Sequence, residues 1–249
     1  MKIKFILYFV LIFFLSEKLI AKSNKAETNT LLVSALFVVQ EIVVQERDSL
    51  FVKYNEALKL LNEKDFSNSL EKGLNLLDKL KSTQYIELEY LCSFLVGDCF
   101  LKMKNHKSAI KFYEKSLKLL ESNNNLFISE NIKYGEINNY LQIKARNFLK
   151  LGTIYARLEK NDSAIFYYKK VIGINSLGSK VLPYKASAFN NLSGIYIKDS
   201  SYILAKNYAL KAVEIRRKNN NKVSEALALS NLANIHVIEK DYVKAKEIY

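Results

Sequence analysis

The stretch Leu-Gly-Thr-Ile-Tyr at residues 151–155 decides the fold, because the chain repeats its pattern downstream. Leu-Ser-Gly-Ile-Tyr follows at 192–196 and Leu-Ala-Asn-Ile-His at 232–236. The first leucines of these three stretches lie 41 and 40 residues apart. Self-similarity at a nearly constant period of this length indicates a chain built from one supersecondary unit used several times.

Small residues recur in step with these stretches. When each repeat is numbered so that the Leu-Gly pair takes positions 7 and 8, positions 8 and 20 hold a small residue in five successive copies. These residues are Ala57, Gly97, Gly152, Ser193 and Ala233 at position 8, and Ser69, Ala109, Ala164, Ala205 and Ala245 at position 20. Two helices that cross closely need residues without bulk at the crossing, and larger side chains fill the space around it. The spacing therefore predicts antiparallel helical hairpins.

This pattern resembles the tetratricopeptide repeat family, whose signature is Trp-x2-Leu-Gly-x2-Tyr, then Ala-x3-Phe, then Pro. The resemblance covers about residues 50–249, with Phe148, Phe189 or Leu229 in place of the tryptophan and no final proline. The period exceeds the usual length of about 34, and such long-period repeats are similar to those of bacterial sensor and regulator proteins. The resemblance implies an all-α, right-handed solenoid of about five hairpins, the last truncated at Tyr249. We expect an insertion of unknown role within 122–144.

Composition agrees with a helical protein. The 249 residues include one proline and seven glycines, the residues that most often interrupt helices. The formal net charge is +13, but the lysines are spread along the chain and do not form the dense basic block or the aromatic interleaving typical of nucleic-acid binding. We therefore expect no nucleic-acid partner.

The N-terminus has the layout of a secretory signal. Residues 1–4 are basic, residues 5–15 form an unbroken apolar run, and Ala21 offers a small residue for cleavage. The apolar run is shorter than the roughly 20 residues needed to span a bilayer. We predict a signal peptide at 1–21 and an exported protein in the periplasm or cell envelope of a bacterium. An uncleaved membrane anchor is the alternative, and otherwise only a segment beyond Tyr249 would enter a membrane. Residues 22–49 are expected to form a helical segment that packs onto the first repeat.

No residues are arranged for catalysis. The segment at 173–180 has the glycine spacing of a phosphate-binding loop, but its final Ser and Lys stand in the wrong order. His106 and His236 occupy different repeats and lack partners at metal-ligand spacing. Cys92 and Cys99 are seven residues apart, too far for a disulfide along one helix, so we expect two core thiols. We predict no enzymatic activity, cofactor or metal in this chain, although a catalytic domain could follow Tyr249.

The resemblance also implies where a ligand would bind. In this family the first helix of each hairpin lines a concave face, with positions 2, 5, 9, 12 and 13 turned towards it. Candidates on or beside these positions are Arg146, Lys150, Arg157, Asn190, Lys198 and Asn234. The cations suit an acidic peptide or a carboxylate, and the asparagines suit an extended peptide backbone. The alternative is a solvated groove without a partner.

These observations favour an exported scaffold that binds a protein or peptide. We expect it to be the extracytoplasmic sensing part of a longer signalling protein, with a membrane helix after Tyr249 and then a histidine kinase or a DNA-binding domain. The alternative is a free-standing adaptor or assembly protein of the cell envelope. The sequence identifies neither the ligand nor the oligomeric state.

Overall fold

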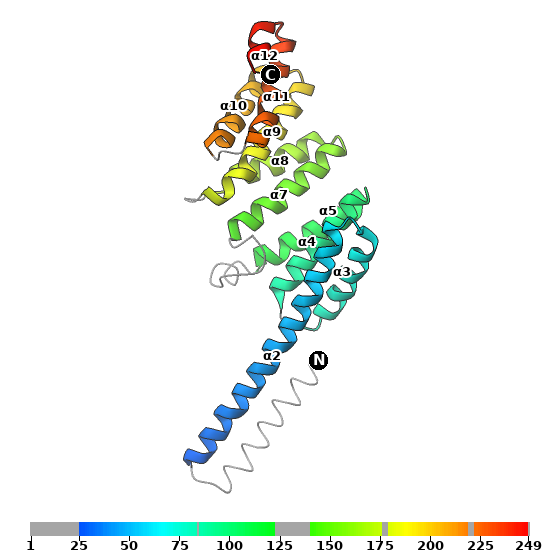
Figure 1. The fold of residues 1–249 in the computed structure, drawn as a ribbon, viewed down its shortest axis with the longest axis vertical. Coiled ribbons are helices and arrows are strands. Elements are labelled where there is room, and N and C mark those ends of the chain that lie inside the picture. Colours follow the sequence, from blue (N-terminus) through cyan, green and yellow to red (C-terminus); the bar gives the residue numbers. More distant parts are fainter. Residues whose placement is uncertain (1–24, 84, 123–139, 176–178, 219–221, 249) are drawn as a thin grey trace. The chain divides into compact units, whose positions relative to one another are not determined.

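A computed structural model describes residues 25–248 except 84, 123–139, 176–178 and 219–221 (Figure 1). These residues form ten α-helices and one short 3-10 helix, so the predicted all-α class is confirmed. The predicted signal peptide at 1–21 and most of the insertion predicted within 122–144 lie outside the described residues. The chain divides into two compact units, residues 1–105 and 106–249, which are described separately.

The first unit contains α2 (Lys25–Asn62), α3 (Phe66–Leu80) and α4 (Ile86–Lys102). Helix α2 contacts both α3 and α4. The predicted boundary between residues 49 and 50 lies inside α2, which crosses this point without interruption. The segment preceding the repeats and the first helix of the first repeat are therefore one element. No glycine or proline lies between residues 25 and 62 to end the helix.

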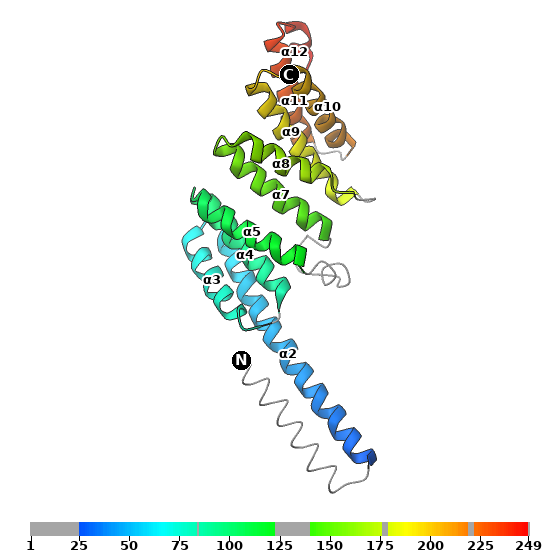
Figure 2. The same cartoon turned by 180° about the vertical axis from the view of Figure 1, so that it is seen from behind.

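The second unit is a succession of antiparallel helices. They are α5 (His106–Ser122), α7 (Tyr140–Arg157), α8 (Asn161–Ile172), a 3-10 helix (Ser179–Val181), α9 (Leu182–Lys198), α10 (Tyr202–Lys218), α11 (Lys222–Ile238) and α12 (Tyr242–Ile248). Each α-helix contacts the next one along the chain, from α5 to α12, and both views show α7 to α12 stacked in chain order (Figures 1 and 2). Pro183 lies in the first turn of α9, where a proline is compatible with a helix.

The small residues at positions 8 and 20 are buried in all five hairpins. In the first hairpin the Ser69 hydroxyl donates a hydrogen bond of 2.8 Å to the carbonyl oxygen of Ala57, which joins the two positions directly. In the third hairpin a Cβ added to Gly152 would lie 2.7 Å from the ring of Tyr168. In these two hairpins, each of which lies within one unit, the predicted close crossing of the two helices explains why these positions are small.

The turn between the two helices of each hairpin has the same backbone geometry throughout. Its position 15 has a positive φ between 57° and 66° in every copy, at Lys64, Lys104, Glu159, Ser200 and Lys240. In the third hairpin the Glu159 amide donates to the Ala156 carbonyl at 3.2 Å and the Lys160 amide donates to the Tyr155 carbonyl at 3.0 Å. This pair of hydrogen bonds is the Schellman motif, which usually has glycine at the left-handed residue. No hairpin of this chain has glycine there.

Substitution of Glu159 by glycine is expected to stabilise the second unit. A left-handed backbone costs a residue with a Cβ about 1–2 kcal/mol, whereas glycine adopts it freely, although glycine also loses more entropy on folding. We expect Glu159→Gly to raise the free energy of unfolding by about 1 kcal/mol, measured by urea denaturation. Glu159→Ala is the control, because alanine keeps the Cβ and should give no such gain. A destabilised Glu159→Gly variant would contradict this account of the turn.

Aromatic side chains occupy three equivalent positions in two consecutive hairpins. In the third hairpin the rings of Tyr155 and Tyr167 stack with centroids 5.5 Å apart, and Phe148 lies 6.2 Å from Tyr167. Burial, with a smaller contribution from the nearby carboxylate of Glu114, raises the pKa of Tyr155. In the fourth hairpin the same positions hold Tyr196, Tyr208 and Phe189, with Tyr196 and Tyr208 again 5.5 Å apart. Both sets pack against the core of the second unit.

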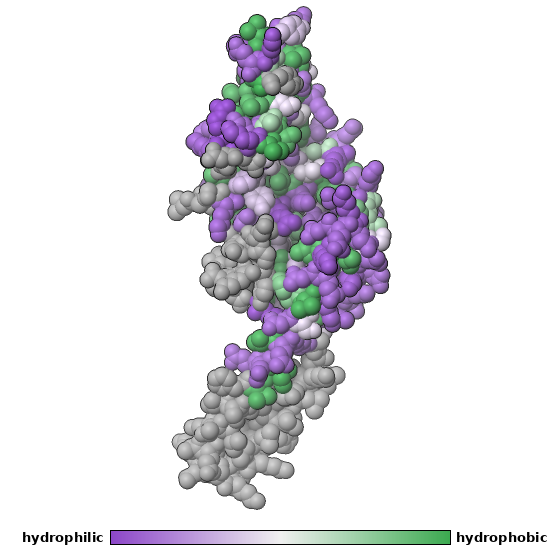
Figure 3. Space-filling model, in the orientation of Figure 1, coloured by the Kyte–Doolittle hydropathy of each residue, from purple (hydrophilic) through white to green (hydrophobic). Residues whose placement is uncertain are grey.

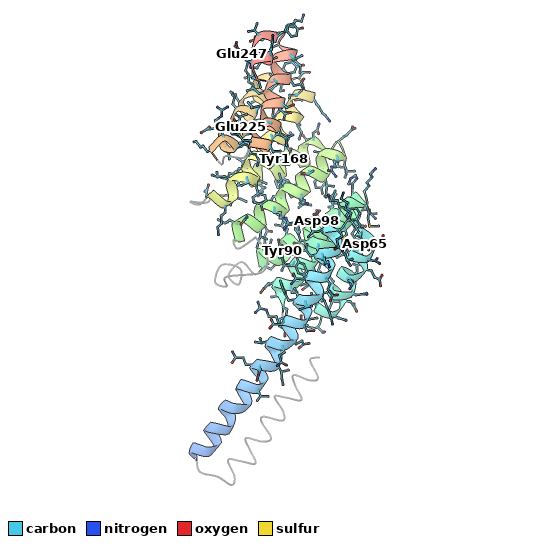
Figure 4. The ribbon with its side chains drawn as sticks, viewed as in Figure 1. Asp65, Tyr90, Asp98, Tyr168, Glu225 and Glu247 are labelled. Carbon is cyan, nitrogen blue, oxygen red and sulfur yellow. The ribbon has the colours of Figure 1, made fainter. Side chains whose placement is uncertain are left out.

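An ion pair joins α10 to α11 on either side of residues 219–221. Nε of Arg217 donates to Oε1 of Glu225 at 2.9 Å, and Nζ of Lys222 lies 3.6 Å from the other carboxylate oxygen. Glu225, labelled in Figure 4, lies in the first turn of α11, and its side chain is buried. The hydrogen bond from Arg217 is the main cause that lowers the pKa of Glu225 below its ordinary value of 4.5, while burial opposes it.

This pair should make the stability of the second unit depend on pH. Because the pKa of Glu225 is lower in the folded state, its contribution is complete at neutral pH and is lost as the pH falls below about 4.5 through the folded-state pKa. The advantage in urea midpoint of the natural chain over Arg217→Gln should therefore shrink between pH 6 and pH 3. Glu225→Gln should show the same loss of pH dependence. An advantage of the natural chain that is constant across this range would contradict the assignment.

Candidate functional site

The first helices of the last three hairpins, α7, α9 and α11, are neighbours in the second unit. Helix α9 contacts both α7 and α11. Together α7 and α9 carry basic side chains but no acidic ones. The basic residues are Lys144, Arg146, Lys150, Arg157, Lys185 and Lys198. This excess of basic over acidic side chains on the two helices favours anionic ligands.

The candidates on α7 are differently placed. Arg146 and Lys150 are half-exposed and lie one turn apart on one side of the helix, because residues four apart share a face. Arg157 is exposed in the last turn of α7. Lys144, which precedes them, lies 3.5 Å from the Glu121 carboxylate. The candidate cations therefore extend from the first half of α7 to its C-terminal end.

The candidates on α9 and α11 include one that is held in place. Nδ2 of Asn231 on α11 donates to the carbonyl oxygen of Asn190 at 3.1 Å and to its Oδ1 at 2.9 Å. Asn190 therefore keeps its side-chain NH2 group for a further acceptor. Lys198 is exposed in the last turn of α9, at the position that Arg157 occupies in the preceding repeat, and Asn234 is exposed on α11. The structure thus places all six candidates on three neighbouring helices.

A partly buried hydrogen bond joins α8 to α9, and it was not predicted from the sequence. Nδ2 of Asn191 on α9 donates to the hydroxyl of Tyr168 on α8 at 3.1 Å. Tyr168 is labelled in Figure 4, and its side chain is fully buried. Burial raises the pKa of Tyr168, and hydrogen bonds with Thr153 and Asn191 oppose this effect. The available signal was the asparagine at position 6 of the fourth and fifth repeats, Asn191 and Asn231.

The remaining polar residues give no catalytic arrangement among the described residues. No three potential metal ligands lie together there. Nδ1 of His236 is buried, 3.4 Å from Oε2 of Glu239 and 3.7 Å from Oδ2 of Asp241. His236 is therefore a buried packing residue of α11. Cys92 and Cys99 are buried free thiols, as predicted, and burial raises the pKa of Cys99.

Comparison with known proteins bears on the repeats. Residues 92–123, 145–176 and 186–219 match the tetratricopeptide repeat family. These segments coincide with the second, third and fourth hairpins of the sequence analysis. No curated protein matches the chain.

Solved structures of similar fold cover most of the chain. BtubC (BKLC) from P. vanneervenii has a TM-score of 0.63 at 17% identity, over 84% of this chain and 82% of that one. RapI has a TM-score of 0.66 at 15% identity, over 87% of this chain but only 57% of RapI. TPR-like repeats of a kinesin light chain from Podosopora anserina have a TM-score of 0.60 at 12% identity, over 80% of this chain and 91% of that one. At these identities the likeness shows the fold alone.

Proposed function

Because this chain belongs to the tetratricopeptide repeat family and is a scaffold for protein–protein interaction, we propose that it binds an acidic segment of a partner protein along α7, α9 and α11. In this proposal Arg146, Lys150, Arg157 and Lys198 pair with carboxylates of the ligand. Asn190 and Asn234 hydrogen-bond to its backbone.

The observation that carries this proposal is the charge of two adjacent helices. Helices α7 and α9 have six basic residues and no acidic one, so a cationic ligand would meet repulsion along both. Guanidinium groups such as those of Arg146 and Arg157 bind carboxylates through two parallel hydrogen bonds. The contact between Asn231 and Asn190 adds a second element, because it orders one polar side chain before any ligand arrives.

Charge reversal on α7 tests the proposal. We expect Arg146→Glu combined with Arg157→Glu to weaken binding of a fluorescent glutamate-rich peptide at least about tenfold, which corresponds to about 1.4 kcal/mol. Fluorescence anisotropy at low and physiological salt would measure the dissociation constant. A lysine-rich peptide of equal length should bind weakly to the natural chain and more tightly to the variant.

The control for this prediction is a double reversal on the first unit. Lys53→Glu combined with Lys79→Glu changes net charge equally, at two exposed residues of α2 and α3. We expect it to leave peptide binding nearly unchanged. Equal losses in the two double variants would show that net charge alone attracts the peptide, and an unaffected Arg146/Arg157 variant would refute this site.

We further propose that the protein is exported and forms the extracytoplasmic sensing part of a longer signalling protein. The basic start and apolar run of residues 1–15 support export, and the long repeat period supports the sensing role. The test is the length of the native gene product, from its reading frame and its mass. A membrane span and a kinase or DNA-binding domain beyond Tyr249 would support the sensing role, whereas an end within a few dozen residues would refute it.

A further inference from the structure

The outer side of α8 combines an exposed aromatic ring with lysines. The inner side of this helix is fixed by buried residues, which are Ala164, Tyr168 and Val171. On the opposite side the Phe166 side chain is 54% exposed. Lys169 and Lys170 lie on either side of it by helical spacing, and Nζ of Lys170 is 5.3 Å from the centre of the Phe166 ring.

The outer side of α10 has the same character. Its inner side is fixed by buried residues, which are Ala205, Ala209 and Ala212. Away from them, Ile203 is 80% exposed, Leu204 47% and Leu210 48%. Lys211 is exposed at the repeat position that Lys170 occupies in α8. The exposed carboxylate on this helix, Glu214, is neutralised by Lys218 at 2.7 Å.

Helix α3 of the first unit is the corresponding helix, and its exposed side chains differ from those of α8 and α10. It therefore serves as an internal reference. Helix α3 is also the second helix of its hairpin, yet its exposed charges balance, with Glu71 and Asp78 against Lys72 and Lys79. Leu74 is its one exposed large apolar side chain, at 39%. On α8 one exposed carboxylate, Asp162, stands against the two lysines, so basic residues outnumber acidic ones there. The combination of exposed apolar side chains with an excess of lysines is therefore a property of α8 and α10 and not of every outer helix.

We propose that the outer sides of α8 and α10 bind the surface of an anionic phospholipid bilayer. Helices that lie on such surfaces present apolar and aromatic side chains among lysines, whose ammonium groups meet the headgroups while their stems cover apolar surface. Protein interfaces are depleted in lysine, so an acidic protein partner fits this surface less well. No helix of the described part of the chain is long and apolar enough to span a bilayer.

A single tryptophan on α8 tests the proposal directly, because the natural chain has none. We expect the emission of Phe166→Trp in the full chain to shift to the blue on vesicles of phosphatidylglycerol and phosphatidylcholine, and to be quenched when brominated lipids are used. Vesicles of phosphatidylcholine alone should cause little change. Leu74→Trp on α3 is the matched control and should show no shift with either vesicle. Because each probe reports its own surroundings, membrane insertion of residues 5–15 does not imitate the result.

Lysine substitutions test the electrostatic part. A lysine near an anionic surface contributes about 1 kcal/mol, or about fivefold in affinity. We therefore expect Lys169→Gln, Lys170→Gln and Lys211→Gln together to weaken vesicle binding of the Phe166→Trp probe. The lipid concentration that gives half of the blue shift should rise about a hundredfold. The matched control carries Lys53→Gln, Lys79→Gln and Lys102→Gln in the first unit and should bind nearly as the unsubstituted probe. Circular dichroism confirms that each variant is folded.

Three results would overturn the proposal. They are no blue shift on anionic vesicles, equal shifts with anionic and neutral vesicles, and a shift that survives loss of the three lysines. Retention on immobilised polyglutamate tests whether this surface binds an acidic protein instead. Retention on it that depends on Lys169, Lys170 and Lys211, without any vesicle-induced shift, would assign this surface to an acidic protein instead of a membrane.

Discussion

Replacement of Gly152 by valine is expected to lower the free energy of unfolding of the second unit by about 3 kcal/mol, at the upper end for overpacking of a tight core. Its first added atom alone would lie 2.7 Å from the ring of Tyr168. That ring is buried, and its hydroxyl is hydrogen-bonded to Asn191, so it cannot move away freely. The helices α7 and α8 would have to separate at their crossing.

Gly194 is the matched control for this prediction. It lies in α9 one repeat further on, and a Cβ added there would meet no atom within 4 Å. Gly194→Ala should therefore stabilise the protein by about 0.5–1 kcal/mol, because alanine loses less backbone entropy on folding than glycine does. Urea denaturation curves of both variants give these differences from the midpoints when the slopes are unchanged. Equal effects at Gly152 and Gly194 would contradict the crossing argument.

Truncation of Tyr168 to alanine should have the largest effect, a loss of about 3–5 kcal/mol as for other large aromatic residues in cores. Tyr168→Phe separates the ring from the hydroxyl. It should cost only about 1 kcal/mol, the usual net contribution of one hydrogen bond, since it leaves Nδ2 of Asn191 without its acceptor. Chemical denaturation measures both. If Tyr168→Phe cost as much as Tyr168→Ala, the hydrogen bond and not the packing would hold α8 against α9.

The two positions should also be coupled. With Tyr168 replaced by leucine, room opens beside position 152, and Gly152→Ala should then cost less than in the natural chain. A double-mutant cycle over the four proteins gives this interaction energy. Additive costs would show that the clash lies with another neighbour.

The repeat positions were predictable because their physical cause is local and recurs. The small residues at positions 8 and 20 are all buried, and within each unit they mark the crossing of two helices. The turn at position 15 was not predictable from residue type, because Glu159 and Ser200 stand where glycine would announce a left-handed residue. The continuity of α2 through residue 50 was also not predicted. The family pattern predicts where a repeat begins, but it does not predict whether an earlier helix continues into that repeat.

The candidate site was predictable only in part. The excess of basic residues on α7 and α9 could be predicted, because it follows from counting charged residue types along the sequence. The contact of Asn231 with Asn190 joins residues 41 apart, and the contact of Asn191 with Tyr168 joins 23. Such contacts depend on side-chain rotamers and on the angle between neighbouring helices. The repeat pattern predicts which helices are neighbours, but it does not predict which of their polar atoms form hydrogen bonds.

The left-handed residue at position 15 also makes this chain suited to labelling at one equivalent position in every repeat. Lys64, Lys104, Glu159, Ser200 and Lys240 are all exposed. Backbone hydrogen bonds close each of these turns, so the geometry does not depend on what the side chain is. Cysteine introduced at any two of them would carry spin or fluorescent labels without disturbing a hairpin. Distances between labels within the second unit would then report how its hairpins open or tighten around a ligand.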